Sequence, residues 1–385
     1  MPLLNGTIIY TLADLNIVAM YVDGEQVDTV PDGKYTLTSE SYCTNEDNEK
    51  DESITISYDS ETKGLSVSPM TKKGTKCYLY FVERLCPEGA TACNTIMAAS
   101  RPQGQTTDWT NNGQGVTYYY TGANPDNWFY FGGFWWRIIR INGDGTIRMI
   151  YQGTSANTTG TGTQIGTSAF NSSYNNNMYV GFKYTSNQVH GTGTNSTILN
   201  TLNSWYTTNI VNKGYSDDVD GNAGFCGDRT PSTSSSSSNG SGGTGTTETY
   251  YGAYIRLYNK GTSNSNPSLQ CDSQDVYTTT DSSSGNKSLQ YPIGLVTADE
   301  AALTGITYNN ANTGSYLYTG EYYWTMSPCW YSRGDASVFS VSSDGRLDRW
   351  HADFAYGVRP VINIRADVSI SSGDGSASNP YVIAT

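Results

Sequence analysis

The sequence predicts a mainly β protein with a few short helices (α+β), and three observations carry this prediction. Glycine, serine, threonine and asparagine are abundant, with 41 glycines in 385 residues, and they disfavour helix interiors. Aromatic residues make up 12% of the chain, which is incompatible with an aromatic-poor disordered chain. Short apolar runs alternate with turn signals such as Asp23-Gly24 and Lys63-Gly64 along much of the chain.

Residues 1–85 are predicted to form a small β-sandwich. Five short segments show alternating or apolar patterns that are typical of strands: 17–22, 34–38, 53–58, 64–68 and 77–82. Cys43 and Cys77 bracket most of this block, so we expect a disulfide between them to staple it. Residues 86–108 contain a helix-compatible stretch around 87–99 and are expected to form a connector.

Residues 109–385 are predicted to form a second, Tyr/Gly/Asn-rich β domain. Its strand candidates are 118–120, 128–141, 146–151, 338–342, 356–364 and 381–383. The sequence from Asn142 to Gly145 is a hairpin signal. An amphipathic helix is predicted over 198–210, capped by Ser196 or Thr197, and a short helix with a capping box is predicted to begin at Thr297. The insert 231–248 has no large apolar side chain and is expected to be a solvated loop.

The seven cysteines favour disulfides over metal binding. Six of them fall into three local pairs, although other connectivities remain open from spacing alone. These pairs are Cys43 with Cys77, Cys86 with Cys93, and Cys226 with Cys271, which leaves Cys329 unpaired. No CxxC motif occurs, and the two histidines lack the spacing of a zinc site. Disulfides indicate an oxidising destination.

The charge and hydropathy of the chain argue against several classes of partner. The 35 acidic residues outnumber the 22 basic ones, and the net charge of −13 disfavours nucleic acid and anionic membrane surfaces. No apolar run is long enough to span a bilayer. Residues 1–20 lack the basic start of a signal peptide. We therefore expect either a trimmed leader or exit by another route, such as inside a virion.

The sequence carries no recognisable catalytic constellation, and we predict a protein that is not an enzyme and uses no cofactor or metal. Phosphate-binding glycine loops, the GxSxG elbow and the HExxH motif are all missing. His190 and His351 are interpreted as surface histidines. Paired carboxylates at 217–218 and 299–300 suit loop solvation and helix capping. The stretch 217–221 offers oxygen ligands but lacks the distal glutamate of a calcium loop.

A candidate binding surface lies between residues 327 and 356. Tryptophan, tyrosine and arginine, which are enriched at binding hot spots, gather there and alternate with structural positions such as Val338 and Leu347. This pattern is typical of a rigid scaffold that displays variable loops, although an ordinary exposed hairpin is the alternative. The predicted ligand-binding residues are Cys329, Trp330, Tyr331, Arg333, Asp335, Arg346, Asp348, Arg349, Trp350 and His351.

Four segments give the second domain a family likeness: GFWWRIIRINGDG at 133–145, YPIGLVTADE at 291–300, YWTMSP at 323–328 and GVRPVIN at 357–363. This order resembles secreted and phage-encoded proteins of gut Firmicutes with C-type-lectin-like domains, including the variable proteins of diversity-generating retroelements. The likeness covers residues 105–383. Residues 1–85 resemble the Ig-like module that often precedes this domain.

The resemblance implies that error-prone reverse transcription varies the binding-face codons between Trp324 and Arg359, which would account for an unpaired Cys329 and a lone His351. No Glu-Pro-Asn or Gln-Pro-Asp tripeptide occurs, so calcium-dependent sugar binding of the animal-lectin type is not implied. The related sulfatase-activating enzymes need an active-site cysteine pair, and no matching pair is present.

The expected function is therefore non-catalytic recognition of a host surface protein or glycan by a phage tail or receptor-binding protein. Its other partners would be virion or tail proteins, and a homo-oligomer would add avidity. The expected location is the virion tail or the extracellular cell surface. The alternatives are a bacterial surface adhesin whose leader was removed, or an enzyme of the same fold with an unrecognised site.

Overall fold

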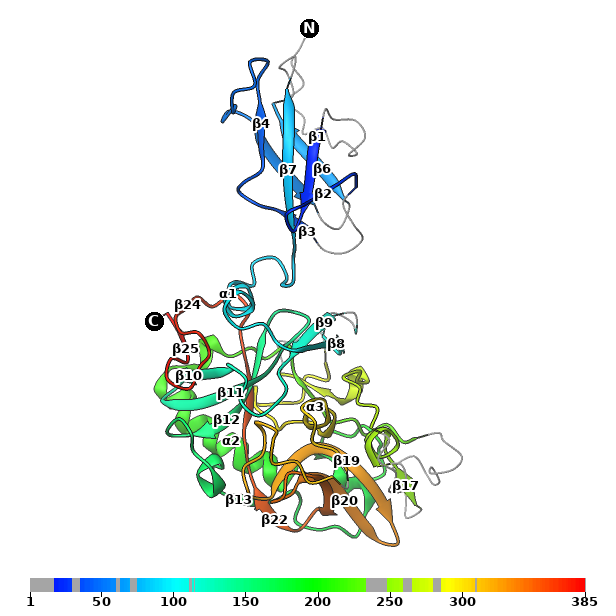
Figure 1. The fold of residues 1–385 in the computed structure, drawn as a ribbon. Helices are drawn as coiled ribbons and strands as arrows, with labels where there is room; N and C mark the ends of the chain where they lie inside the picture. Colours follow the sequence, from blue (N-terminus) through cyan, green and yellow to red (C-terminus); the bar gives the residue numbers. More distant parts are fainter. Residues whose placement is uncertain are drawn as a thin grey trace. The chain divides into compact units, whose positions relative to one another are not determined.

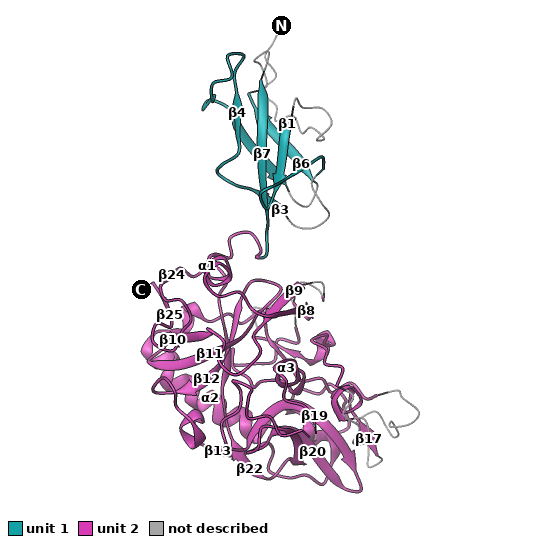
Figure 2. Ribbon diagram, viewed as in Figure 1, with its two compact units in different colours: residues 1–85 teal, residues 86–385 magenta. Residues whose placement is uncertain are grey.

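The structure, a computed structural model, describes residues 17–29, 35–59, 63–69, 75–110, 113, 115–232, 248–258, 265–279, 285–308 and 310–384. The chain forms two compact units, unit 1 with residues 1–85 and unit 2 with residues 86–385 (Figure 2). Both are built mainly of strands, so the predicted mainly β class is confirmed. The described strands form sheets of eight, six and five strands and three two-stranded ribbons.

Unit 1 contains a five-stranded sheet and a hairpin. The sheet has the order β2-β1-β7-β3, β4 also pairs with β7, and β5 pairs with β6. The strands are β1 (Ile17–Val22), β2 (Glu25–Val27), β3 (Tyr35–Leu37), β4 (Tyr42–Thr44), β5 (Thr55–Asp59), β6 (Gly64–Ser68) and β7 (Lys76–Glu83). The five predicted strand segments correspond to β1, β3, β5, β6 and β7, whereas β2 and β4 were not predicted. Lys34, in the second predicted segment, lies outside the described residues.

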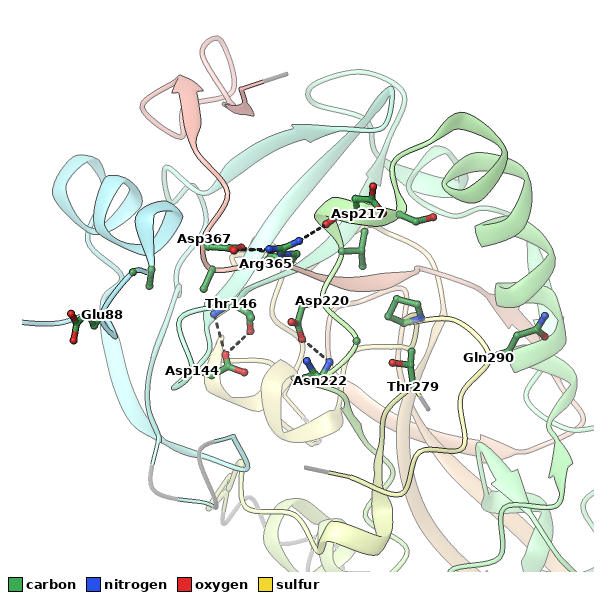
Figure 3. Close-up of a pocket in the computed structure, with 17 residues that line it drawn as sticks. Glu88, Asp144, Thr146, Asp217, Asp220, Asn222, Thr279, Gln290, Arg365 and Asp367 are labelled. Atoms are coloured by element: carbon green, nitrogen blue, oxygen red, sulfur yellow. Dashed lines mark hydrogen bonds and ion pairs between the residues drawn. The ribbon is translucent and has the colours of Figure 1, made fainter. Parts of the chain in front are cut away.

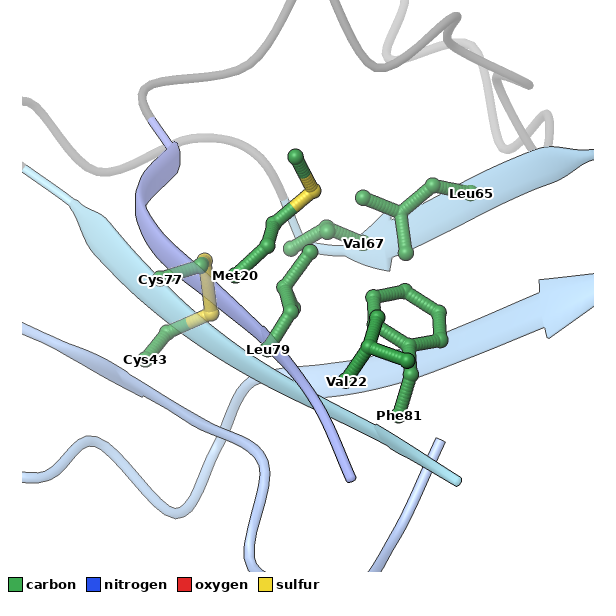
Figure 4. Packing of buried hydrophobic residues seen from close by; sticks show 8 residues of the cluster. All are labelled: Met20, Val22, Cys43, Leu65, Val67, Cys77, Leu79 and Phe81. Atoms are coloured by element: carbon green, nitrogen blue, oxygen red, sulfur yellow. A yellow bond between two sulfur atoms is a disulfide. The ribbon is translucent and has the colours of Figure 1, made fainter. Parts of the chain in front are cut away.

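The core of unit 1 follows the period-2 alternation of β7. Cys77, Leu79 and Phe81 are buried, while Tyr78 and Tyr80 between them are half-buried. The same core contains side chains from β1, β4 and β6, as Figure 4 shows: Met20, Val22, Cys43, Leu65 and Val67. The hydrophobic pattern of a single strand therefore determines which side of the sheet is inside.

All three expected local disulfides are present. They join Cys43 to Cys77, Cys86 to Cys93, and Cys226 to Cys271. Cys329 is the free cysteine, and it is buried.

The largest sheet of unit 2 has eight strands in the order β23-β12-β11-β10-β25-β24, with β9 paired to β11 and β8 paired to β9 (Figure 1). Its strands are β8 (Gly104–Asp108), β9 (Gly115–Tyr119), β10 (Trp128–Phe131), β11 (Phe134–Ile141), β12 (Ile147–Gly153), β23 (Val361–Ile364), β24 (Ile370–Ser372) and β25 (Tyr381–Ile383). The predicted hairpin signal at 142–145 does join two antiparallel neighbours, β11 and β12.

The second sheet of unit 2 carries the segment predicted to bind ligand. Its order is β13-β22-β19-β20-β21, and β17 pairs with β19. These strands are β13 (Thr167–Ala169), β17 (Thr249–Tyr250), β19 (Tyr323–Ser332), β20 (Asp335–Val341), β21 (Leu347–His351) and β22 (Ala355–Gly357). The remaining ribbons pair β14 (Lys183–Tyr184) with β15 (Thr194–Asn195), and β16 (Phe225–Cys226) with β18 (Val276–Tyr277).

Two predicted strands are each divided in two. The segment 128–141 is broken by a tight turn at Gly132 and Gly133, whose φ angles of 64° and 85° favour glycine. The segment 356–364 separates into β22 and β23, and Pro360 between them has no N–H to donate to a ladder. In both cases the apolar run continues in the sequence, but a glycine turn or a proline ends the strand.

The helices are few and short. They are α1 (Thr91–Ala99), α2 (Thr197–Asn209) and α3 (Ala298–Leu303), a π-helix η7 (Tyr254–Tyr258), and the 3-10 helices η3 (Gly160–Thr163), η4 (Asn177–Val180), η5 (Val211–Lys213), η6 (Ser216–Asp218) and η9 (Ser273–Asp275). Ser196 caps α2, and its hydroxyl accepts from the Leu199 N–H at 3.2 Å. The predicted capping box of α3 is present between Thr297 and Glu300.

The segment 86–108, expected as a connector, is instead part of unit 2. Helix α1 buries Ala92, Cys93 and Ile96, and β8 forms a full antiparallel ladder with β9. The reason is that α1 has an apolar face and β8 has a strand partner, which a solvated connector would lack. Helix-compatible composition alone does not show whether such a face is covered.

A buried ionic network ties α3 to the eight-stranded sheet. Arg140 of β11 contacts Asp108 and, at 2.8 Å from its Nε, the Glu300 carboxylate; Arg148 of β12 lies 2.5 Å from the same Glu300 oxygen. All four side chains have no exposed surface. The charges balance, and the Arg140 guanidinium also lies over the Trp109 ring at 4.4 Å. This network fixes α3, which also contacts β19, β20 and β21.

Among the described residues, no helix has the length and apolar character needed to cross a membrane. The predicted solvated insert 231–248 lies outside the described residues except at its two ends.

Candidate functional site

A groove of about 380 Å³ lies on the β19-β20-β21 part of the six-stranded sheet. It is lined by Trp330, Asp335, Ser337, Asp348, Arg349, Trp350 and His351. All of these except Ser337 were predicted to bind ligand, so the fold brings six of the ten predicted residues together from three strands.

A tight turn and the pairing of the strands place these side chains. Arg333 and Gly334, with φ angles of 56° and 93°, connect β19 to β20. The register then aligns Trp330 of β19 with Ser337 of β20, and Ser337 with His351 of β21. Residues that are separated by up to 21 positions in sequence therefore stand in one row across the sheet.

Cys329 and Tyr331 are not available to a ligand, which corrects two of the predicted positions. Cys329 has no exposed surface and Tyr331 is 3% exposed. Burial raises the pKa of the Cys329 thiol well above its usual value. The Tyr331 hydroxyl donates to the Asn175 carbonyl at 3.2 Å. Both residues neighbour Trp330 on β19, and the alternation of a strand turns them towards the interior.

Arg333 and Arg346 lie at the two hairpin turns and do not line the groove. Arg333 is an exposed turn residue. Arg346 pairs with Asp344 at 3.5 Å between Nε and Oδ2, with both side chains more than two-fifths exposed. An exposed pair of this kind stabilises the turn only weakly.

Trp330 at the groove is supported by η7, a contact that the sequence did not predict. The rings of Tyr254 and Tyr258 each lie 5.4 Å from the Trp330 ring in edge-on contact. The Arg349 guanidinium covers Trp330 at 4.3 Å and Tyr258 at 4.9 Å. Tyrosines four residues apart indicate one helix face, but their partner Trp330 lies more than 70 residues away, and no local signal connects them.

His351 at the groove also belongs to an exposed aromatic stack. The imidazole stacks on Tyr174 at 4.9 Å with an interplanar angle of 24°, and Phe354 meets it edge-on at 5.9 Å. Tyr174 is 36% exposed and Phe354 is 41% exposed. Trp350 also packs against Phe354, at 5.2 Å. The groove thus combines rigid aromatic side chains with few flexible ones.

Arg349 and His351 of the groove each have a carboxylate beside them. The Arg349 Nη1 atom lies 3.6 Å from Asp348 Oδ1, and His351 Nε2 lies 3.6 Å from Asp335 Oδ2. The groove therefore carries no large excess of either sign of charge.

The π-helix is fastened by an arginine clamp. The Arg256 guanidinium donates two hydrogen bonds of 2.8 Å to the Asp299 carboxylate of α3, and Nη2 lies 2.5 Å from Asp228. Asp299 also accepts from the Ser268 N–H at 2.9 Å. Because η7 carries Tyr254 and Tyr258, this clamp positions the two rings that pack against Trp330.

Replacing Arg256 with lysine is expected to destabilise unit 2 by about 1–2 kcal/mol, because an ammonium group cannot make the two parallel bonds to Asp299. The matched control is Arg365→Lys. Arg365 makes a similar two-point contact with Asp367, but both side chains are about half exposed. Its loss should cost well under about 1 kcal/mol. Urea denaturation measures both, and equal losses would contradict the clamp.

A larger cavity of about 930 Å³ lies elsewhere in unit 2 (Figure 3). Its acidic lining includes Asp144, whose pKa burial raises to about 6, and Asp217 and Asp220 of the segment considered for calcium. Asp220 accepts from the backbone N–H groups of Asn222 and Ala223, so it organises its own turn. Within the described residues no group of three or more histidine, cysteine or acidic side chains could hold a metal ion.

His190 lies in a turn, with 22% of its side chain exposed, and belongs to an ion-pair cluster. Its Nδ1 is 3.1 Å from Oδ1 of Asp275, a fully buried carboxylate that also pairs with Arg229 at 3.1 Å. The hydrogen bond to Asp275 raises the pKa of His190 above its usual 6.5, against the opposing effects of burial and Arg229. Asp272 adds a smaller attraction.

This shift predicts a pH-dependent contribution to stability. A raised folded-state pKa means that the stabilisation by His190 is full below the unfolded-state value and is lost as pH rises through the folded-state value. Melting temperatures of the natural chain and of His190→Gln should therefore differ most in mildly acidic buffer and converge above neutral pH. The same difference in melting temperature between the two proteins at every pH would contradict this role of His190.

Comparisons with protein-family models, with curated proteins and with solved structures found no match for this chain.

Proposed function

We propose that the protein is a non-catalytic ligand-binding protein that displays the β19-β20-β21 groove towards a host surface protein or glycan, in the manner of a phage tail or receptor-binding protein. Unit 1 would be an Ig-like spacer, and unit 2 a C-type-lectin-like display domain. The observation that supports this proposal most directly is the gathering of six predicted ligand-binding residues around one groove.

The construction of the sheet supports a display role. Val338, Phe339, Val341 and Leu347 have no exposed surface, so they hold β20 and β21 in place. Most of the groove residues on the same strands and on the end of β19 are partly exposed. Side chains at such positions can change while the buried ones keep the backbone fixed. The three disulfides suit an extracellular location.

Sequencing this locus across a natural population tests the proposal. Substitutions should concentrate at Trp330, Asp335, Asp348, Arg349, Trp350 and His351, at codons whose counterparts in a matching template contain adenine, with a reverse transcriptase nearby. Buried Val338 and Leu347 should not vary, and the β11–β12 hairpin of the same unit is the control segment. An even spread of substitutions over both hairpins would contradict the diversified-binder proposal.

A further inference from the structure

We infer that the groove takes an uncharged, hydroxyl-rich ligand, the terminal one or two sugars of a neutral glycan, held by side chains without a metal ion. This inference rests on the proposed function, because it names the ligand class of the same groove.

The charge pattern disfavours an anionic ligand. Anions bind where cationic donors lack a carboxylate partner, and here Arg349 is paired with Asp348 and His351 with Asp335. A phosphate, sulfate or sialic acid would have to displace these carboxylates. The same contacts place Arg349 beside Asp348 and His351 beside Asp335, so neither aspartate is poised to help hold a metal ion.

The hydrogen-bonding groups favour a ligand that both donates and accepts. Asp335 and Asp348 carry carboxylate oxygens that can accept from hydroxyl groups. On the donor side, the Arg349 side chain is 27% exposed, and its guanidinium can donate to a ligand oxygen. Sugar hydroxyls meet both needs with one functional group.

The edge of β21 disfavours an extended peptide. A peptide that adds to a sheet needs a row of free backbone groups. On β21, the Leu347 N–H donates to the Thr307 carbonyl at 3.0 Å and the Arg349 N–H donates to Asp348 Oδ1 at 2.8 Å. The His351 carbonyl accepts from the Phe354 N–H at 3.1 Å. Recognition therefore falls to side chains.

The tryptophan side chains that line the groove, and its volume, fit a sugar ring. Tryptophan offers a flat apolar face with a polar N–H, which matches the apolar face and polar rim of a pyranose. The groove volume of about 380 Å³ lies at the small end of the range of roughly 300–1,000 Å³ that is usual for small-ligand sites. One or two sugars would fill such a space.

The test is binding of the full chain, biotinylated and tetramerised on streptavidin, to an array of neutral, sialylated and sulfated glycans in buffer with EDTA. We expect a subset of neutral glycans to be retained. Asp335→Ala should weaken that binding roughly tenfold, as expected for loss of a hydrogen bond to a charged group. The matched control is Asp367→Ala, another exposed, cation-paired aspartate in unit 2, and it should bind like the natural chain.

Trp350→Phe keeps an aromatic ring but removes the indole N–H and part of the aromatic surface, so it should also weaken binding even if the aspartate variant is poorly folded. Retention of anionic glycans alone, no retention of any glycan, or binding that EDTA abolishes would each overturn the inference. None of these results changes the expected pattern of substitutions across the population, so failure of the sugar assignment is distinguishable from failure of the proposed function.

Discussion

Glu300→Ala is expected to destabilise unit 2 by about 3–5 kcal/mol, the cost of removing one partner from a buried ion pair. The substitution leaves two fully buried arginines, Arg140 and Arg148, with Asp108 as their remaining carboxylate. It also removes the acceptor that the Thr297 N–H uses at 2.9 Å in the capping box of α3. Two independent supports of α3 are therefore lost together.

Tryptophan fluorescence during urea denaturation measures this effect selectively, because all eight tryptophans lie between residues 109 and 350 and report on unit 2. Glu321→Ala is a control, since Glu321 is only partly buried and lies in the same unit. Glu300→Gln should be intermediate, because it restores the hydrogen-bond acceptor but not the charge. A loss below about 1 kcal/mol for Glu300→Ala would contradict the role of the network.

Removal of the Cys226–Cys271 disulfide by paired serine substitutions should cost about 4 kcal/mol, because it closes a loop with a sequence separation of 45 residues. Cys226 also packs against Trp109, Leu269 and Val276, so its loss disturbs apolar contacts as well. The loop contains η7, and its release should loosen the packing of Tyr254 and Tyr258 against Trp330.

The control for this prediction is the Cys86–Cys93 disulfide, whose separation is only 7 residues. Loop-closure entropy assigns it a smaller effect of about 2.5 kcal/mol. Denaturation of both variants and of the natural chain, followed by tryptophan fluorescence, gives the comparison. A larger loss for the short loop than for the long one would show that chain entropy is not the main source of stabilisation.

The local elements of this fold could be predicted from the sequence because their signals are local. The alternation around Cys77, the hairpin signal at Asn142 and the capping box at Thr297 each depend on a few neighbouring residues. Breaks inside apolar runs were harder to predict. The strand pattern continues through Gly132 and Pro360, where only backbone geometry shows a boundary.

The residue types of the candidate site could be predicted from the sequence, but the burial of its individual side chains could not. The concentration of tryptophan, arginine and aspartate pointed to the strands that carry the groove, but the phase of β19 was not apparent, so Cys329 and Tyr331 were included although they are buried. The contact between Tyr258 and Trp330 and the pairing of Arg140 with Glu300 join residues 70 to 160 positions apart. Such contacts are set by the assembled fold, and a single sequence carries no local sign of them.

The strand order of the eight-stranded sheet has a consequence for synthesis on the ribosome. The central strands β10, β11 and β12 emerge early, but their neighbours β25 and β23 are made more than 200 residues later. During translation the edges of β10 and β12 therefore lack these partners until residues up to 383 have left the exit tunnel. Unit 2 can accordingly complete its folding only once residues up to 383 have been synthesised, and nascent chains that stop short of residue 361 are expected to aggregate or to require chaperones.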